Sequence, residues 1–334
     1  MLSTIAIESI KRRKTTALLT LLSITISISL LLCVDIVRSQ VKTSFTRTVS
    51  GVDLIVGAPS GQLNLLLSSV FNIGTPTKGI DYKSVASLKS NKQVSWLIPL
   101  SLGDTHRGFR VIGTTNRFFE HFKYGDKQAL ALTEGRVFEQ PLSTVVGADV
   151  ADSLGYTVGD KIIVSHGLGS VSFNNHDDHP FIISGILEKT GTPVDKAVYV
   201  TLQGLEKAHS GPKSAHTSRL RKKTAFLNGH STNEHEHEHE HEHEHEEPTQ
   251  DNYDSDAFTP ESVSVVMLGL KNRAAALQLQ YQINQSKKEP LMAILPGMAL
   301  AELWQIMGNV EALLLGLSGL IVICALIGLA TMLL

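Results

Sequence analysis

Two long apolar segments, one near each end of the chain, most constrain what this sequence can fold into. The segment from Ala312 to Leu334 contains no charged residue, and a similar run extends from Thr15 to Val34. A helix needs about 20 apolar residues to cross the roughly 30 Å hydrocarbon core of a bilayer. The sequence therefore predicts two transmembrane helices, over residues 15–37 and 312–334, with a polar region between them.

The residues before the first apolar run set the predicted orientation. Apolar residues recur at helical spacing over residues 1–14, which predicts an amphipathic helix at the membrane surface. The four residues from Lys11 to Lys14 are basic, and positive charge beside a span favours the cytoplasmic side. A cleaved signal peptide shares this order, but its apolar core has only about 7–15 residues. We expect a retained span, a cytoplasmic N-terminus, and residues from about 40 to 307 outside the cytoplasm.

Small and hydroxylated residues occur in both predicted spans. Such residues often lie where membrane helices pack closely, although each hydroxyl can instead bond the carbonyl four residues before it. Both interpretations are open for this chain. The residues concerned are Thr20, Ser23, Thr25, Ser27 and Ser29 in the first span, and Gly316, Ser318, Gly319 and Gly328 in the second.

The central region reads as a mixed α/β domain, because short apolar runs alternate with turn residues. Asp81 is placed to cap one helix, and Gly155 to end another. The stretch from Gly103 to Gly108 is rich in turn residues and predicts a turn between two strands. We predict helices over residues 81–88, 148–154, 272–284 and 297–309, and strands over residues 52–56, 94–102, 109–112, 144–146, 161–164, 181–187, 195–200 and 263–270.

Residues 210–259 interrupt this domain with a polar, low-complexity segment that we expect to be disordered. Histidine and glutamate alternate within it, and imidazole with carboxylate suits zinc or another transition metal. A solvated insertion without a ligand is the alternative interpretation. The candidate ligands in this tract are His235, His237, His239, His241, His243 and His245.

A second cluster, His176-Asp177-Asp178-His179, supplies His176 and His179 as further candidate ligands. Polar turn chemistry explains this cluster equally well. The isolated histidines are expected on the surface, and they are His106, His121, His166, His209 and His216.

Composition and motifs exclude several functions. The formal net charge of -2 gives no basic stripe of the kind that nucleic-acid binding requires. The sequence contains no G-x-x-x-x-G-K-[ST] or G-x-S-x-G motif, and we expect neither a catalytic site nor a bound cofactor other than metal. The two cysteines, Cys33 and Cys324, lie in the apolar runs, so the central region holds no disulfide.

Several ordered segments resemble the MacB/FtsX-like permease subunits of ABC transporters. Each is a glycine turn beside a strand or the start of a span, and their order and spacing together make the resemblance specific. The segments are KRRKTTALLTLLSITISISLLL, Asp53 to Gly57, Ile112 to Thr114 with Phe118-Phe119, Glu134 to Phe138, Val146-Gly147 with Leu154-Gly155 and Val158 to Asp160, Ile183 to Leu187, and Thr331-Met332.

The resemblance implies an α+β membrane protein whose two transmembrane helices flank a periplasmic core domain of the MacB type. That domain would comprise residues 38–209 and 260–296, separated by the insertion at 210–259 and followed by a stalk helix over 297–311. The family is expected to have four spans, so we expect this chain to be truncated at Leu334.

The resemblance also implies a location, partners and a mode of action. The protein would lie in a bacterial inner membrane, in contact with lipid, beside a second permease copy and a cytoplasmic ATPase subunit that hydrolyses the ATP. A periplasmic binding or adaptor protein is a further expected partner. Three functions remain open. The protein transports zinc or another transition metal, it transports lipoproteins or peptides, or it is a tethered metal-binding or sensor protein without transport.

Overall fold

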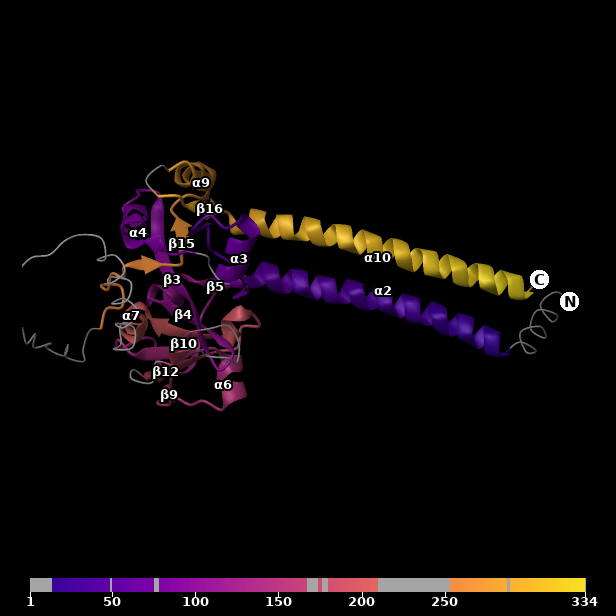
Figure 1. Ribbon diagram of the computed structural model, residues 1–334, viewed down its shortest axis with the longest axis horizontal. Coiled ribbons are helices and arrows are strands. Elements are labelled where there is room, and N and C mark those ends of the chain that lie inside the picture. The colour runs from indigo at the N-terminus through magenta and orange to yellow at the C-terminus, as the bar shows by residue number, and fades with distance from the viewer. Residues whose placement is uncertain are drawn as a thin grey trace, which may run out of the picture. The chain divides into compact units, whose positions relative to one another are not determined.

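The computed structural model describes residues 14–48, 50–74, 78–166, 174–175, 180–209, 253–286 and 289–333. The chain forms two compact units. One unit is helical and comprises Met1–Thr46 and Gly297–Leu334, and the other is the central domain, Arg47–Pro296 (Figure 1).

The helical unit consists of two long helices, α2 (Lys14–Thr48) and α10 (Pro296–Leu333). In α10, the stretch Pro296–Gly328 is long and apolar enough to cross a membrane. The apolar stretch of α2, Leu21–Ile36, is shorter and includes Asp35. Among the described residues, one helix therefore meets the criterion for a span, and the other predicted span stays a prediction. The stretches expected as stalk and second span form the single helix α10.

The hydroxyl groups of α2 adopt both of the arrangements that the sequence left open. Thr25 Oγ1 donates to the Leu21 carbonyl over 2.8 Å, which is the local interaction. Ser27 in α2 and Ser318 in α10 are each only 7% exposed, although large apolar side chains near them are exposed. The small side chains of Ser27 and Ser318 are thus covered, one in each helix.

The central domain is built on one mixed sheet with the strand order β16-β1-β15-β3-β4-β13-β8-β12-β7 (Figure 1). The sheet is antiparallel except for the parallel pairs β4–β13 and β8–β12. These strands are β1 (Leu54–Gly57), β3 (Val94–His106), β4 (Phe109–Thr114), β7 (Leu132–Gly135), β8 (Ser143–Val146), β12 (Phe181–Leu187), β13 (Ala197–Thr201), β15 (Val265–Leu270) and β16 (Met292–Ile294).

Shorter elements complete the described part of the domain. The short strands are β2 (Ile80–Asp81), β5 (Lys123–Tyr124), β6 (Gln128–Ala129), β9 (Lys161–Ile162), β10 (Ser165–His166), β11 (Asn174–Asn175) and β14 (Ser262–Val263). The helices are α3 (Gln62–Val70), α4 (Tyr82–Lys89), α5 (Arg117–His121), α6 (Ala148–Leu154), α7 (Leu202–His209) and α9 (Ala276–Asn284), with short 3-10 turns at Pro193–Lys196 and Arg273–Ala275.

The long strand β3 joins two hydrophobic cores. Its first half packs in a core with β1, β15, α4 and α9, which includes Leu97, Leu268 and Leu279. Beyond β3, the strands β4, β8, β12 and β13 form a second core with α6 and α7. One continuous sheet thus links two groups of helices, each packed on its own core.

The turn predicted over Gly103–Gly108 is wrong in extent. β3 continues to His106, and the chain reverses only at Arg107 and Gly108, which have φ angles of 47° and 89°. The register between β3 and β4 shifts between Leu102 and Asp104. This bulge accommodates Gly103, at φ 139°, inside a strand instead of ending it.

Local end signals predicted two helices well. Asp81 caps α4, and its Oδ1 accepts a hydrogen bond from the Lys83 N–H over 2.8 Å. Gly155 ends α6 in the left-handed conformation, at φ 67°. The strand predicted from residue 195 begins later, at Ala197, because Pro193–Lys196 forms a 3-10 turn.

Candidate functional site

The histidines predicted as metal ligands lie outside the described residues. They are His176, His179, His235, His237, His239, His241, His243 and His245. Within the described ranges, no group of three or more His, Cys, Asp or Glu side chains is arranged to hold a metal ion. Metal binding by the two histidine clusters therefore stays a prediction.

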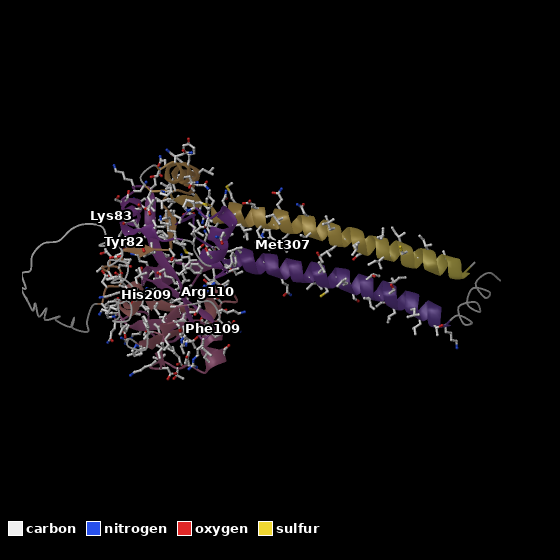
Figure 2. All side chains as sticks on the ribbon, in the orientation of Figure 1. Tyr82, Lys83, Phe109, Arg110, His209 and Met307 are labelled. Carbon is white, nitrogen blue, oxygen red and sulfur yellow. The ribbon has the colours of Figure 1, made fainter. Side chains whose placement is uncertain are left out.

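The two ends of the histidine-rich insertion are both fixed near α7. His209, the last residue of α7 (Figure 2), has its Nε2 atom 3.2 Å from Oδ2 of Asp104 on β3. Where the chain returns, the Tyr253 hydroxyl donates to Oε1 of Gln203, also on α7, over 3.2 Å. The insertion thus leaves and re-enters the domain at one helix.

Residues 253–259, which composition assigned to the insertion, are held on the domain. Ser255 is 2% exposed, and its Oγ accepts a hydrogen bond from the Asn116 N–H over 2.8 Å. Arg117 Nε donates to Asp256 Oδ2 over 2.7 Å. Composition did not reveal this anchoring because the partners, at the start of α5, are about 140 residues earlier in the chain.

The surface position expected for His106 is wrong. Its ring is only 5% exposed and lies between the Ile163 carbonyl and the Tyr156 hydroxyl, with both contacts at 2.7 Å. A carbonyl oxygen only accepts, so Nδ1 carries the proton and Nε2 accepts from Tyr156. Burial lowers the pKa of His106, the hydrogen bond to Ile163 partly opposes this, and the charge of Arg107 adds to the lowering.

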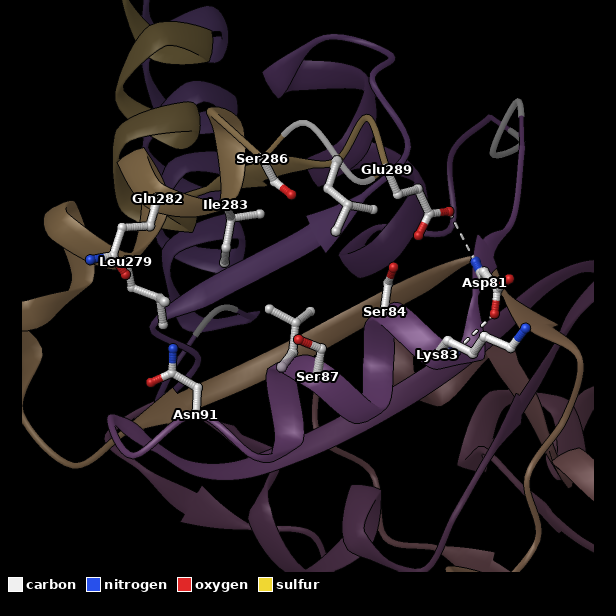
Figure 3. A pocket seen from close by; sticks show the side chains of 12 residues that line it. Asp81, Lys83, Ser84, Ser87, Asn91, Leu279, Gln282, Ile283, Ser286 and Glu289 are labelled. Atoms are coloured by element: carbon white, nitrogen blue, oxygen red, sulfur yellow. Dashed lines mark hydrogen bonds between the residues drawn. The ribbon is translucent and has the colours of Figure 1, made fainter.

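A groove between α4 and α9 is the candidate binding site (Figure 3). Its volume is about 620 Å³, within the range of known ligand pockets. The two walls carry hydroxyls and amides above an apolar floor. The lining residues are Asp81, Lys83, Ser84, Ser87, Leu88 and Asn91 on the α4 side, and Leu279, Gln282, Ile283, Ser286, Glu289 and Leu291 on the α9 side.

Glu289 lies at one end of this groove beside Asp81. Its Oε1 accepts a hydrogen bond from the Asp81 N–H over 3.1 Å, which fixes the carboxylate. Its Oε2 is buried and has no hydrogen-bond partner among the described groups. Figure 3 shows this second oxygen turned toward Ser84 and the interior of the groove. The groove therefore ends at a positioned acceptor that no described residue of the domain uses.

Sequence reasoning did not find this groove, and no local signal points to it. The α4 wall lies near residue 85, and the α9 wall lies almost 200 residues later. Only the pairing of β15 with β3 brings the two helices onto the same core. Asp81 was recognised as a helix cap, but its main-chain contact with Glu289 depends on the tertiary structure.

The family comparison decides the identity of the domain. Residues 17–225 match the model of the MacB-like periplasmic core domain. This chain belongs to that family. The matched region covers more than half of the chain and confirms the resemblance to MacB/FtsX-like ABC transporter permeases. It includes the α4 wall of the groove, whereas α9 lies beyond it.

Two solved structures are similar to this MacB-like domain. The periplasmic region of MacB from Actinobacillus actinomycetemcomitans is 9% identical, with 79% of this chain and 98% of that chain covered and a TM-score of 0.41. The extracellular domain of the noncanonic ABC-type transporter YknZ from Gram-positive bacteria is 13% identical, with 73% and 99% covered and a TM-score of 0.34. No curated protein matches the sequence.

Membership in the MacB-like family places this chain among ABC transporter permease components, which are membrane proteins with a periplasmic domain. The α/β domain described above is therefore of the type that forms the periplasmic part of such components. The insertion at α7 and the groove between α4 and α9 are features of this domain, and both are candidates for its contacts with other molecules.

Proposed function

We propose that this protein is the permease subunit of a MacB/FtsX-type ABC transporter and transmits ATPase-driven motion to its periplasmic domain. ATP binding and hydrolysis occur on a separate cytoplasmic subunit. The N-terminus lies in the cytoplasm, residues from about 40 to 307 lie in the periplasm, and a second permease copy completes the membrane part. A periplasmic adaptor or binding protein is a further partner.

The pairing of β1 with β16 carries this proposal. β1 follows α2 after a short connection, and β16 is followed almost at once by α10, which begins at Pro296. The two strands are neighbours in the sheet, with Ile55 opposite Ile294 and Val56 opposite Ala293. A displacement of either long helix therefore acts on one hydrogen-bonded strand pair.

The lengths of the helices support the same mechanism. With 35 residues, α2 is about 52 Å long, and with 38 residues α10 is about 57 Å long. Both exceed the roughly 30 Å hydrocarbon core of a bilayer. The remaining length extends each helix outside the membrane, where it serves as a lever between the membrane part and the sheet.

Uncoupling α10 from β16 tests the proposal. Insertion of three glycines after Leu295 gives a flexible joint and keeps the Leu295 side chain, and the same insertion after Asp126, in an exposed turn, is the control. We expect the Leu295 variant to assemble with its ATPase and to permit ATP hydrolysis, but not to complement a deletion strain. Full complementation would contradict the lever mechanism. A failure of the parent chain to co-purify with any ATPase subunit would contradict the permease assignment.

We further propose that zinc or another transition metal binds the Glu/His tract and is the ligand or cargo of the system. Neutral imidazoles from His235 to His245 alternate with carboxylates, and both are ligands for zinc. Calorimetric titration of zinc into the full chain, with and without residues 233–247, tests this. Equal zinc affinity in both proteins would remove the tract from the function.

A further inference from the structure

The groove between α4 and α9 has the chemistry of a peptide-binding site. We infer that it binds a short extended segment of a partner protein, with a lysine ammonium of that segment at Glu289. This inference concerns the periplasmic domain alone and does not depend on the lever mechanism or on metal binding.

The carboxylate of Glu289 selects a cationic group. One oxygen is held by the Asp81 N–H at 3.1 Å, whereas the other is buried without a hydrogen-bond partner. A buried acceptor that makes no hydrogen bond is unfavourable, and an ammonium group supplies both the donor and the opposite charge. Asp81 adds a second carboxylate at this end of the groove. Among the described lining residues Lys83 is the basic one, and Figure 3 shows its Nζ atom beyond Asp81, away from the groove centre.

The walls of the groove select a peptide main chain with apolar side chains. Ser84 and Ser87 on α4 face Ser286 on the α9 side, and all three offer donors and acceptors to a main chain. Below them, apolar side chains form a floor that can receive a leucine-like side chain. These floor residues are Leu88, Leu279, Ile283 and Leu291.

The dimensions of the groove limit the bound segment to a few residues. α4 has eight residues and is about 12 Å long. An extended chain advances about 3.3 Å per residue, so about four residues fit along the wall. With its ammonium at Glu289, a lysine at one end of the segment places the preceding residues over the apolar floor.

A metal ion is a weaker match for this site. Glu289 and Asp81 are the carboxylates among the described lining residues, which include neither histidine nor cysteine. Hard cations prefer six or more oxygen ligands, and one oxygen of Glu289 is already used by the main chain. Competition between a metal ion and the peptide for Glu289 is therefore an outcome of the test that would contradict the inference.

The first experiment uses a matched pair of peptides. The full chain, reconstituted in lipid nanodiscs, is titrated with acetyl-Leu-Ser-Leu-Lys-amide, and binding is followed by ligand-observed NMR. The second peptide is identical except that its lysine is acetylated on the side chain. We expect the charged peptide to bind at least about tenfold more tightly than the acetylated one, because a charge-assisted hydrogen bond is lost. Equal binding of the two peptides, or no binding of either, overturns the inference.

The second experiment uses variants that keep the domain folded. Glu289→Gln preserves the acceptor for the Asp81 N–H and removes the charge, and we expect at least about a tenfold loss of affinity for the charged peptide. Glu188→Gln, at an exposed site outside the groove, is the matched control. Ser87→Trp obstructs the groove, whereas Lys89→Trp lies on the same helix outside the lining. Unchanged binding by Glu289→Gln and Ser87→Trp would show that the peptide binds elsewhere and would overturn the inference.

A charge reversal distinguishes specific recognition from general attraction. Glu289→Lys should lose the lysine peptide and gain affinity for a peptide in which glutamate replaces the lysine. Addition of calcium or zinc to the parent chain should leave its affinity for the lysine peptide unchanged. Competition by either ion would assign the carboxylate to metal and contradict the inference.

Discussion

The carboxamide of Asn284 pairs with the main chain of Ala293 in both directions. The Ala293 N–H donates to Asn284 Oδ1 over 2.6 Å, and Asn284 Nδ2 donates to the Ala293 carbonyl over 3.3 Å. Gln280 Nε2 donates to the same carbonyl over 3.1 Å. β16 is the last strand on its side of the sheet. Side chains of α9 thus form hydrogen bonds with main-chain groups of this edge strand that would otherwise be open to pairing with another strand.

Replacement of Asn284 by alanine should weaken this edge. We expect the free energy of unfolding to fall by about 1 kcal/mol, because two hydrogen bonds are lost and alanine recovers part of this as a better helix former. Chemical denaturation followed by tryptophan fluorescence measures the change. Gln278→Ala, on the exposed side of α9, is the control and should leave stability nearly unchanged. An equal midpoint for parent and Asn284→Ala would show that the pairing contributes nothing.

Elements with local end signals could be predicted from the sequence. Asp81 and Gly155 were assigned correctly as the cap of α4 and the terminus of α6, because their effect depends on residues within one turn. Gly103 was assigned to a turn, although it lies in a bulge within β3. Whether a glycine ends a strand or bulges within it depends on the partner strand, which the local sequence does not specify.

The groove could not be predicted for the same physical reason. Ser84, Ser286 and Glu289 have no shared local pattern, and tertiary pairing brings their segments together. His106 was expected on the surface because it stands alone among the histidines of the sequence. Its burial depends on Tyr156 and Ile163, which are more than 45 residues later. Features formed within one segment, such as the helix cap at Asp81, could be predicted from the sequence. Sites assembled from distant segments, such as the groove and the surroundings of His106, could not.

Gly269→Ala should be destabilising because Trp96 occupies the space above Gly269. A Cβ atom at Gly269 would lie 2.0 Å from Cε2 of Trp96 on the paired strand β3. Trp96 also stacks on His121, with ring centroids 5.4 Å apart, so it does not move without losing a contact. We expect a loss of about 1–3 kcal/mol in the free energy of unfolding. Denaturant titration of purified protein measures it.

A double-mutant cycle identifies the cause of that loss. Trp96→Leu removes the ring that the added methyl would meet, so Gly269→Ala should cost much less in the Trp96→Leu background. The expected coupling between the two sites is about 1 kcal/mol or more. Additive effects would mean that the alanine acts through the backbone of β15 and not through the indole.

Deletion of residues 210–252 should leave the domain folded. His209 and Tyr253 are held by Asp104 and Gln203, so both ends of the insertion are fixed on the domain. Replacement by an eight-residue Gly/Ser linker shortens the loop, and we expect stability to be unchanged or raised by about 1–2 kcal/mol. The thermal midpoint of the full chain measures this. Tyr253→Phe in the deleted protein tests the anchor, and it should lower the midpoint. An unfolded deletion protein would show that the insertion itself supports the fold.

His106 should make the domain less stable in acid. Burial lowers its pKa below the ordinary value of 6.5, so below that pH the unfolded chain binds a proton that the folded chain excludes. Stability is therefore complete above about pH 6.5 and falls as the pH drops toward the lowered pKa of the folded state. Protonation would also place a second N–H against the Tyr156 hydroxyl, which now donates to Nε2.

Denaturation midpoints between pH 5 and 8 should show this decline in the parent and in His121→Gln, whose histidine is partly exposed. His106→Gln should be less stable than the parent at neutral pH, but its denaturation midpoint should change little between pH 5 and 8. An equal slope in the parent and His106→Gln would assign the acid sensitivity to other groups.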